Sequence, residues 1–404
     1  MASSGWDKRE GAVRTETRNL SLIGGSASEE TTPSAAALPS ASGVQPVQFL
    51  RAFTRDNAIM AIDPFEADQL QPASLDLRLD RKAYRVRASF LPGGADVRTR
   101  IEAMDGLPID LSHGAVLETG KVYVIPLQEI LDLPQHVRGF ANPKSTTGRL
   151  DVLTRLITER GDVFDEVPPG YKGRLYVEVA PQTFSVVVYP GTRLNQLRLQ
   201  RGTSRITLAN GDLRRRYRAG ELVRPFDGKH ALPNNFVPVT IDLRGRGVGD
   251  VVGYKAKRFT DRIDLRKIRH YEWEDYWEPI VYRKEPTLTL HPGEFYILAT
   301  REEVRVPPDL AAEMVAYEAR SGEYRVHYAG FFDPGFGCEP DRGSKAVLEV
   351  RSHQIPFMLE HGQPIGWLRY EKMAAVPTET YSAAIGSSYQ SQGLALAKQF
   401  RATG

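Results

Sequence analysis

The stretch "LETGKVYVIPLQEILDLPQHVRGF" (117–140) has an echo in the second half of the chain, "LHPGEFYILATREEVRVPPDLAAEM" (290–314). Two further pairs of segments recur in the same order. Residues 72–88 are echoed by 237–258, and residues 170–199 are echoed by 335–370. Three echoes in one order indicate that a single structural unit has been duplicated within the chain.

Beyond residue 45, alternating apolar and polar residues predict mostly short β-strands, as in "RLYVEVA" and "FSVVVYP". Gly and Pro turns separate them, and helical patterns are brief: "VQFLRAF" (47–53) and "LAAEMVAYEA" (310–319). This spacing favours a sandwich or barrel. The sequence therefore predicts an all-β protein with a first lobe over 45–230 and a second over 231–404.

Composition excludes several classes of protein. The 404 residues include 53 Lys and Arg against 50 Asp and Glu, so a net charge of +3 predicts neither a nucleic-acid nor a membrane partner. Cys338 is the single cysteine, which excludes disulfides within the chain and multi-cysteine zinc sites and favours a cytoplasmic protein. Residues 1–44 are polar, without the apolar segment of a signal peptide, and predict a disordered tail.

The loop "NPKSTTGR" (142–149) combines two cations with three hydroxyls. Lys144 and Arg149 can form charge-assisted hydrogen bonds with a polyphosphate, and Ser145 and Thr146 can form neutral ones. Gly148 allows close backbone approach. The alternative is an ordinary polar surface loop.

Two carboxylates in the second half suit catalysis or substrate binding. Asp333 lies in the turn of "FFDPGFG" (331–337), and Glu349 lies within the apolar strand "AVLEV" (346–350). Burial in such a strand would raise the pKa of Glu349, as a general base or proton shuttle requires. Glu178, within "LYVEV" (175–179), is its counterpart in the first half. The alternative is that both glutamates point into solvent.

The C-terminal stretch "TETYSAAIGSSYQSQG" carries Tyr381, Tyr389 and Gln392 in a Gly- and Ser-rich setting. Such an arm can close over a ligand and exclude water. Packing on a neighbouring subunit is the alternative.

Taken together, these motifs resemble the dCTP deaminase branch of the dUTPase-like fold, once per half, from about residue 45 to 400. The loop at 142–149 is similar to the family's Arg-Ser-Ser-x-x-Arg loop, and "HYAGFFDPGFG" to its Asp-Pro-Gly hairpin. The strand "AVLEV" resembles the strand with the catalytic glutamate, "GQPIGWL" the strand after it, and "SSYQSQG" the closing arm.

The resemblance implies hydrolytic deamination of dCTP to dUTP and ammonia. Glu349 would activate water, assisted by Ser145 and Arg149, and Asp333 would bind the deoxyribose 3′-hydroxyl. The remaining substrate contacts are expected from Lys144, Thr146, Val347, Leu348, Tyr381 and Gln392. Mg²⁺ would accompany the triphosphate, without a catalytic zinc, and feedback by dTTP and a homo-oligomer with a trimer-like arrangement of lobes are also expected.

Each half departs from the family's pattern. Pro168 stands where the first hairpin would have its aspartate, and in the second half either Arg320 or Arg325 could replace the last arginine of the loop. The sequence therefore predicts one composite site: the loop from the first half, with the hairpin, glutamate and arm from the second. A dUTP diphosphatase, a bifunctional enzyme that yields dUMP, and a non-catalytic nucleotide sensor are the alternative functions.

Overall fold

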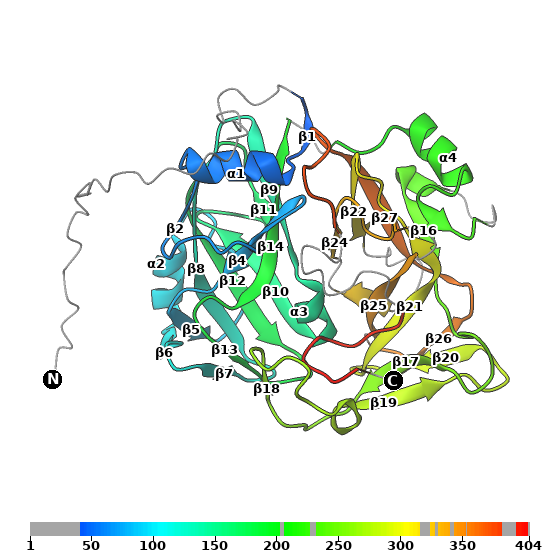
Figure 1. Cartoon of the computed structure of the whole chain (residues 1–404). Helices are drawn as coiled ribbons and strands as arrows, with labels where there is room; N and C mark the ends of the chain where they lie inside the picture. The colour runs from blue at the N-terminus through cyan, green and yellow to red at the C-terminus, as the bar shows by residue number, and fades with distance from the viewer. Residues whose placement is uncertain are drawn as a thin grey trace, which may run out of the picture. The chain divides into compact units, whose positions relative to one another are not determined.

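A computed structural model describes residues 41–202, 206–226, 232–315, 324–327, 330–339, 343–352, 354–381 and 393–402 of the chain (Figure 1). Arg320, Gln392 and most of the predicted N-terminal tail lie outside these residues. Short antiparallel strands dominate the described chain, which confirms the predicted all-β class.

Two sheets form the first lobe. One has the strand order β11-β9-β14-β4-β3, with β1 beside β14, and the other β10-β12-β8-β5-β6, with β2 beside β8. The first sheet comprises β1 (Gly43–Val44), β3 (Leu70–Gln71), β4 (Ser74–Arg78), β9 (Val137–Pro143), β11 (Glu166–Val167) and β14 (Arg193–Arg201). The second comprises β2 (Ile59–Ala61), β5 (Lys82–Val86), β6 (Leu107–Asp110), β8 (Val122–Asp132), β10 (Val152–Thr158) and β12 (Lys172–Pro181).

The second lobe repeats this plan. Its sheets have the orders β24-β22-β27-β16 and β23-β25-β21-β17-β19, with β15 beside β21. The strands of the first are β16 (Val237–Thr240), β22 (Leu310–Val315), β24 (Phe331–Phe332) and β27 (Pro364–Lys372). Those of the second are β15 (Val223–Arg224), β17 (Val251–Ala256), β19 (Trp277–Val281), β21 (Phe295–Val304), β23 (Tyr324–His327) and β25 (Ser344–Ser352).

The two lobes correspond strand by strand. Strands β11, β9, β14 and β4 match β24, β22, β27 and β16 in order, and the four strands from β10 to β5 match those from β23 to β17. The pair β13 (Val186–Val188) and β7 (Ala115–Leu117) likewise matches β26 (Phe357–Glu360) and β20 (Thr287–Leu290). The same connectivity in both halves supports the duplication that the sequence echoes predict.

The helices are few and short. The predicted helix at 47–53 is present as α1 (Val47–Arg55), accompanied by α2 (Val97–Ala103), α3 (Ser145–Arg149) and α4 (Asn210–Arg218). The helix predicted over 310–319 is wrong at its start, because Leu310–Val315 forms β22 between β24 and β27. Pairing on both edges and burial override the helical preference of its alanines. No helix in the described part of the chain is both long and apolar enough to cross a membrane.

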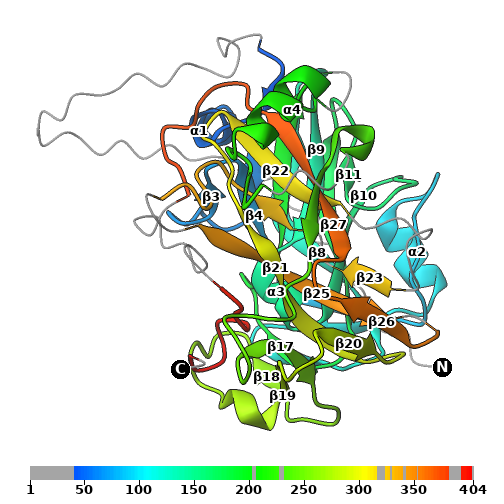
Figure 2. The same cartoon turned by 90° about the vertical axis from the view of Figure 1, so that its right-hand side faces the viewer.

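The boundary between the lobes falls earlier than predicted. Leu208, Leu213 and Tyr217 pack in the core of the second lobe, and β15 pairs with β21, so the segment 208–224 belongs to the second lobe (Figure 2). The first lobe also begins before residue 45, because Gly43 pairs with Arg201 in β1. Gly43 has φ of +143°, and a Cβ there would lie 2.7 Å from backbone atoms of Lys372 and Ala374.

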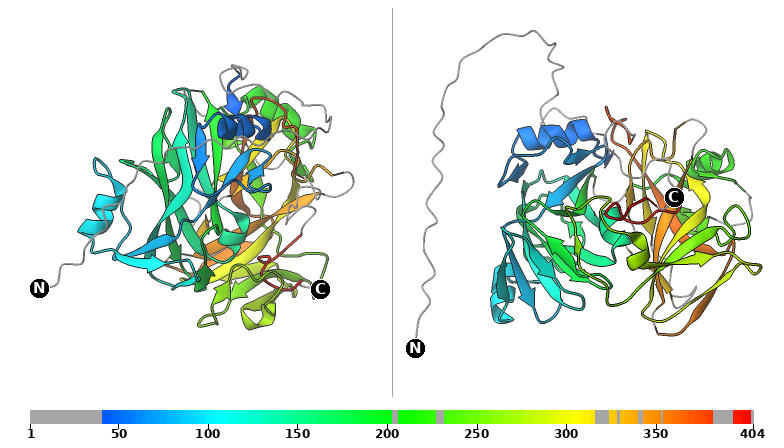
Figure 3. Two further views of the ribbon diagram at one scale, coloured as in Figure 1. Left: turned by 60° about the vertical axis from the view of Figure 1, so that its left-hand side comes forward. Right: turned by 60° about the horizontal axis from the view of Figure 1, so that its bottom comes forward.

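The second half also contributes to the core of the first lobe. Trp277, Phe295 and Phe400 belong to the same buried cluster as first-lobe residues such as Phe184, whose ring centroid lies 5.3 Å from that of Trp277. Strand β18 (Ile263–Asp264) pairs in parallel with β13 of the first lobe. The C-terminal segment runs between the lobes (Figure 3). Residues of the second half therefore complete the core of the first lobe, while the second lobe also has a core of its own.

Candidate active site

A cavity of about 590 Å³ lies where the two halves meet, a size typical of ligand sites. The first lobe contributes α3 and the start of β14, and the second contributes the hairpin at 330–336, strand β25 and part of the C-terminal segment (Figure 1). Among the predicted site residues, the following line it: Lys144, Ser145, Thr146, Arg149, Asp333, Val347, Leu348, Glu349 and Tyr381. The structure thus brings the two predicted sets together in one place.

Glu349 is held in the cavity wall by strand alternation. Val347 and Glu349 lie on one face of β25, whereas Leu348 and Val350 lie on the other face, in the core of the second lobe. Leu348 therefore meets the cavity through its backbone. Glu349 is only 6% exposed, and this burial raises its pKa to about 8, although the positive charge of Arg149 opposes the rise and Asp151 adds to it. Such a carboxyl group can exchange a proton near neutral pH.

Arg149 is the last residue of α3 and lines the cavity. The helix begins at Ser145, directly after Lys144, whose backbone is extended. Its side chain is buried, and Nη1 donates to the carbonyl oxygen of Ala395 at 3.1 Å, so the C-terminal segment fixes it from the other side. The hydroxyl of Thr147 donates to the carbonyl of Leu194 at 2.8 Å and attaches the short helix to β14. Arg149 is thus positioned by both halves of the chain.

An ion pair between the lobes lies beside Arg149 and Glu349. Arg351, two residues after Glu349, donates through Nε to both oxygens of Asp151 at 3.2 and 3.1 Å, and its Nη2 donates to Thr183 at 2.7 Å. Asp151 is fully buried and follows Arg149 by two residues. Asp151 and Arg351 each lie two residues from a cavity residue, Arg149 and Glu349 respectively. Their bidentate ion pair therefore fixes the spacing of α3 from β25.

The hairpin presents Asp333 in an aromatic setting. The ring centroids of Phe332 and Phe336 lie 5.1 Å apart, and the ring centroid of Tyr381 lies 5.6 Å from that of Phe336. Burial raises the pKa of Asp333, while the charge of Arg198 and its hydrogen bond to Asp333 lower it. Gly335 makes the turn with φ of +97°, and a Cβ there would lie 2.8 Å from that of Thr380. These rings and this carboxylate suit a flat base and a sugar hydroxyl.

A second set of cations at the cavity escapes the sequence analysis. Arg193, Arg266 and Lys398 line it together with Lys144, which forms an ion pair with Asp76. Arg193 donates to Asp68 at 2.8 Å and to Glu66 at 2.6 Å. Loss of solvation and the charge of Lys144 lower the pKa of Lys398. Four cations therefore lie in one region of the cavity, together with the three carboxylates that pair with Lys144 and Arg193.

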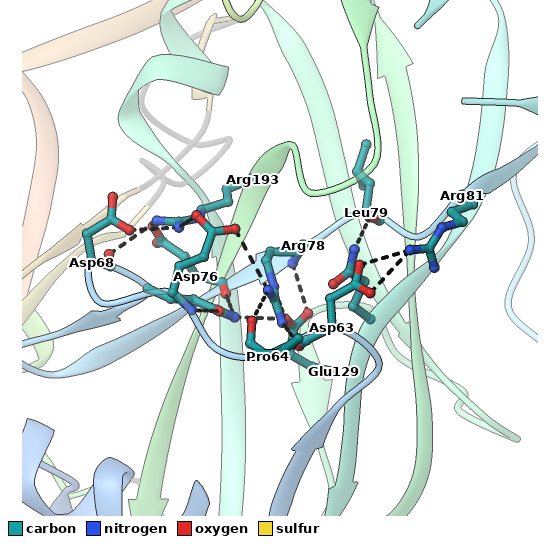
Figure 4. Close-up of polar contacts among 12 residues, drawn as sticks. Asp63, Pro64, Asp68, Asp76, Arg78, Leu79, Arg81, Glu129 and Arg193 are labelled. Atoms are coloured by element: carbon teal, nitrogen blue, oxygen red, sulfur yellow. Dashed lines mark hydrogen bonds and ion pairs between the residues drawn. The ribbon is translucent and has the colours of Figure 1, made fainter. Parts of the chain in front are cut away.

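A buried hydrogen-bond network centred on Arg78 lies next to the cations of the cavity in the first lobe. Arg78 on β4 donates through Nε to Glu129 on β8 at 2.9 Å, and both side chains are buried (Figure 4). Arg78 also donates to the carbonyl oxygens of Pro64 and Asp63 at 2.7 and 2.8 Å. The network ties β4, which carries Asp76, to the other sheet of the first lobe.

The counterpart of Glu349 does not line the cavity. Glu178 is buried on β12, where Nε and Nη2 of Arg155 donate to it at 3.0 and 2.5 Å, and Arg155 stacks on Phe164 at 3.9 Å. Arg155 is the register partner of Glu178, in the position that His327 takes opposite Glu349. The carboxylate of Glu178 is thus held in an ion pair with Arg155, in the half of the chain where Pro168 stands in place of an aspartate.

Of the alternative loop arginines, Arg320 is outside the described residues. Arg325 lies on β23, whose backbone pairs it with Arg351. In the described part of the chain, no three His, Cys, Asp or Glu side chains group as they would around a metal ion.

The fold and the cavity define a duplicated β protein with a buried carboxyl group in a cavity that several cations line. Sequence models of one family match both lobes: the N-terminal domain of 2′-deoxycytidine 5′-triphosphate deaminase matches residues 41–203, and its C-terminal domain matches residues 209–400. The chain belongs to the dCTP deaminase family, in a long form with both domains.

Individual proteins that resemble this chain carry the name of the same family. A crystal structure of 2′-deoxycytidine 5′-triphosphate deaminase from Agrobacterium tumefaciens is 45% identical with a TM-score of 0.79, covering 83% of this chain and 97% of that one. The dUMP-forming dCTP deaminase of Corynebacterium diphtheriae is 29% identical over 37% of this chain and 77% of its own length. The dCTP deaminase of Natronomonas pharaonis is 28% identical over 46% of this chain and 90% of its own.

Replacing Arg351 tests the role of the ion pair between the lobes. In Arg351→Met, Asp151 loses its cation, which raises the pKa of Glu349 further because the uncompensated negative charge lies nearby. We expect kcat for the family's reaction to fall by about tenfold or more through misplacement of Arg149. The acid limb of the pH–rate profile should also shift to higher pH.

Lys345→Met is the matched control. Lys345 lies on the same strand and pairs with Asp242 at 2.5 Å within the second lobe, and neither residue lines the cavity. We expect this variant to keep both the rate and the profile. An Arg351→Met protein that folds and keeps the wild-type profile would contradict the role assigned to the pair.

Proposed function

We propose that this protein is a dCTP deaminase that converts dCTP and water to dUTP and ammonia at one site per chain. The observation that carries the proposal is Glu349, a buried carboxyl group with a pKa of about 8, in the same cavity as Arg149 and Asp333. Family membership supports dCTP as the substrate.

The proposed reaction needs a proton carrier next to the base. Water attacks C4 of cytosine, an O–C4 bond forms, and the C4–N bond to the exocyclic amine then breaks. Glu349 takes a proton from the attacking water on a carboxylate oxygen and passes it to ring N3 as the O–C4 bond forms. It then takes the proton of the new C4 hydroxyl group and passes it to the amine, which leaves as ammonia while the C4 carbonyl forms. Arg149 and the hydroxyl of Ser145 would orient the water and stabilise the negative charge that develops on the ring.

The rest of the cavity would hold the nucleotide. The rings of Phe332 and Phe336 form its aromatic side, and Asp333 would accept the sugar hydroxyl. Lys144, Arg193 and Lys398 would bind the triphosphate. Mg²⁺ would enter with the substrate, and Asp68 and Glu66, which line the cavity beside Arg193, offer the oxygen ligands that this ion prefers.

A bifunctional enzyme that releases dUMP is the second candidate. Asp333 and Glu349 line the same cavity, so a water molecule near the phosphates could be activated in addition to the one at C4. Several relatives carry names that include dUMP formation. Separating dCTP, dUTP and dUMP after incubation with dCTP and Mg²⁺ distinguishes the two candidates.

We expect Glu349→Gln to lose ammonia release by about 10²-fold or more while it still binds dCTP, because the amide keeps the shape but cannot carry the proton. Glu178→Gln is the matched control, since its carboxylate pairs with Arg155 outside the cavity. We expect it to keep full activity. Activity should also survive a zinc chelator in excess Mg²⁺.

The opposite pattern, with Glu178→Gln inactive and Glu349→Gln active, would contradict the site assignment. Loss of activity with the chelator that zinc alone restores would contradict the proposed mechanism. Absence of ammonia release from dCTP by the wild-type protein would favour the nucleotide sensor.

The raised pKa of Glu349 predicts the pH dependence of the reaction. The base form of the carboxylate exists above a pKa of about 8, because burial makes the charged form unfavourable below it. We expect kcat/KM for dCTP to rise about tenfold per pH unit from pH 6 and to level off near pH 8. A profile that levels off near the ordinary glutamate pKa of about 4.3 would contradict this assignment.

A further inference from the structure

Arg198 is a buried arginine at the centre of β14, and its guanidinium crosses from the first lobe to the hairpin of the second. The residue has no exposed surface. Its Nη1 donates to the carbonyl oxygen of Ala312 at 3.0 Å, and its Nη2 donates to the carbonyl oxygen of Phe332 at 3.3 Å and to Oδ1 of Asp333 at 3.2 Å. The planar group thus binds both the backbone and the carboxylate of the hairpin.

Two further contacts hold the guanidinium in place. It lies over the ring of Phe331 at 4.0 Å from the centroid, and Nη1 lies 3.7 Å from the buried carboxylate of Glu371. Because these contacts surround the group, Arg198 has a single orientation in which one edge faces Asp333. A buried arginine that binds a hairpin in this way determines where the hairpin carboxylate points.

The duplication supplies an internal comparison. Arg369 occupies the position of Arg198 in the second lobe, since β27 pairs with β22 as β14 pairs with β9. It does not have an aspartate to bind across the interface, because Pro168 replaces that residue in the first hairpin. Instead Arg369 donates to Glu313 of its own lobe at 2.6 Å. Among the residues that the structure describes, the contact from this strand arginine to a hairpin carboxylate of the other lobe is therefore made by Arg198 and not by Arg369.

We propose that Arg198 is a specificity-determining positioning residue, which aims Asp333 at the sugar 3′-hydroxyl of the nucleotide and favours the ionised form of its carboxyl group. This inference rests on the proposed function. An ionised carboxylate accepts a hydroxyl in a charge-assisted hydrogen bond, roughly twice as strong as a neutral one. Without a cation at hydrogen-bond distance, a carboxyl group buried to this extent would favour its neutral form.

The test compares dCTP with 2′,3′-dideoxy-CTP, which lacks the 3′-hydroxyl. We expect wild-type protein to prefer dCTP in kcat/KM by about tenfold or more, the range of a hydrogen bond to a charged group. Arg198→Met should lose most of this preference, because Asp333 then accepts the hydroxyl poorly. Arg198→Lys keeps a cation without the planar fork and should retain an intermediate preference.

Arg369→Met is the matched control. Arg369 is a mostly buried arginine on the equivalent strand, and it contacts Glu313 rather than the hairpin carboxylate. We expect it to leave the dCTP preference unchanged even if it lowers stability. An Arg198→Met protein that folds and keeps the wild-type preference would overturn the proposal. If Arg198→Met does not fold, an unchanged preference in Arg198→Lys would overturn it.

Calorimetric binding of the two nucleotides separates this inference from the proposed function. If the wild-type protein releases no ammonia but binds dCTP better than the dideoxy nucleotide, deamination is wrong and the role of Arg198 is still tested by the same variants. Equal binding of both nucleotides by wild-type protein would overturn the role of Asp333, and with it that of Arg198.

Discussion

The ion pair between Asp151 and Arg351 joins the two lobes at the position on which the site depends. Residues of both lobes line the cavity, so the proposed chemistry requires that α3 and β25 keep a fixed separation. A bidentate pair between a fully buried carboxylate and a mostly buried arginine provides this constraint, and removing one partner of such a pair typically costs about 3–5 kcal/mol. The shared core around Trp277 and Phe400 fixes the same arrangement on a larger scale.

Duplication followed by unequal change is consistent with the single site per chain that we propose. In the first lobe, Arg155 pairs with Glu178, and Pro168 replaces the hairpin aspartate. In the second lobe, Arg369, the counterpart of Arg198, binds Glu313 of its own lobe. The carboxylates of Glu178 and Glu313 are thus each held by an arginine of their own lobe. The pseudo-symmetry of the fold is thereby compatible with a single asymmetric site.

Much of the fold and part of the site follow from the sequence, because strand alternation and local motifs are short-range signals. From these signals we predicted the all-β lobes and a common site for Arg149, Asp333 and Glu349. The remaining groups depend on pairing between distant residues: Arg198 and Asp333 are 135 positions apart, and Arg351 and Asp151 are 200 apart. In the sequence, such arginines look like ordinary strand cations, and only the packing of the lobes reveals their partners.

The central claim is that the two lobes together form one nucleotide site. It is tested most directly by calorimetric titration of the Glu349→Gln protein with dCTP and Mg²⁺, which gives the number of nucleotides bound per chain without turnover. The account predicts one dCTP per chain. Two per chain would contradict it, because the second site would have to use the hairpin with Pro168 and the paired Glu178.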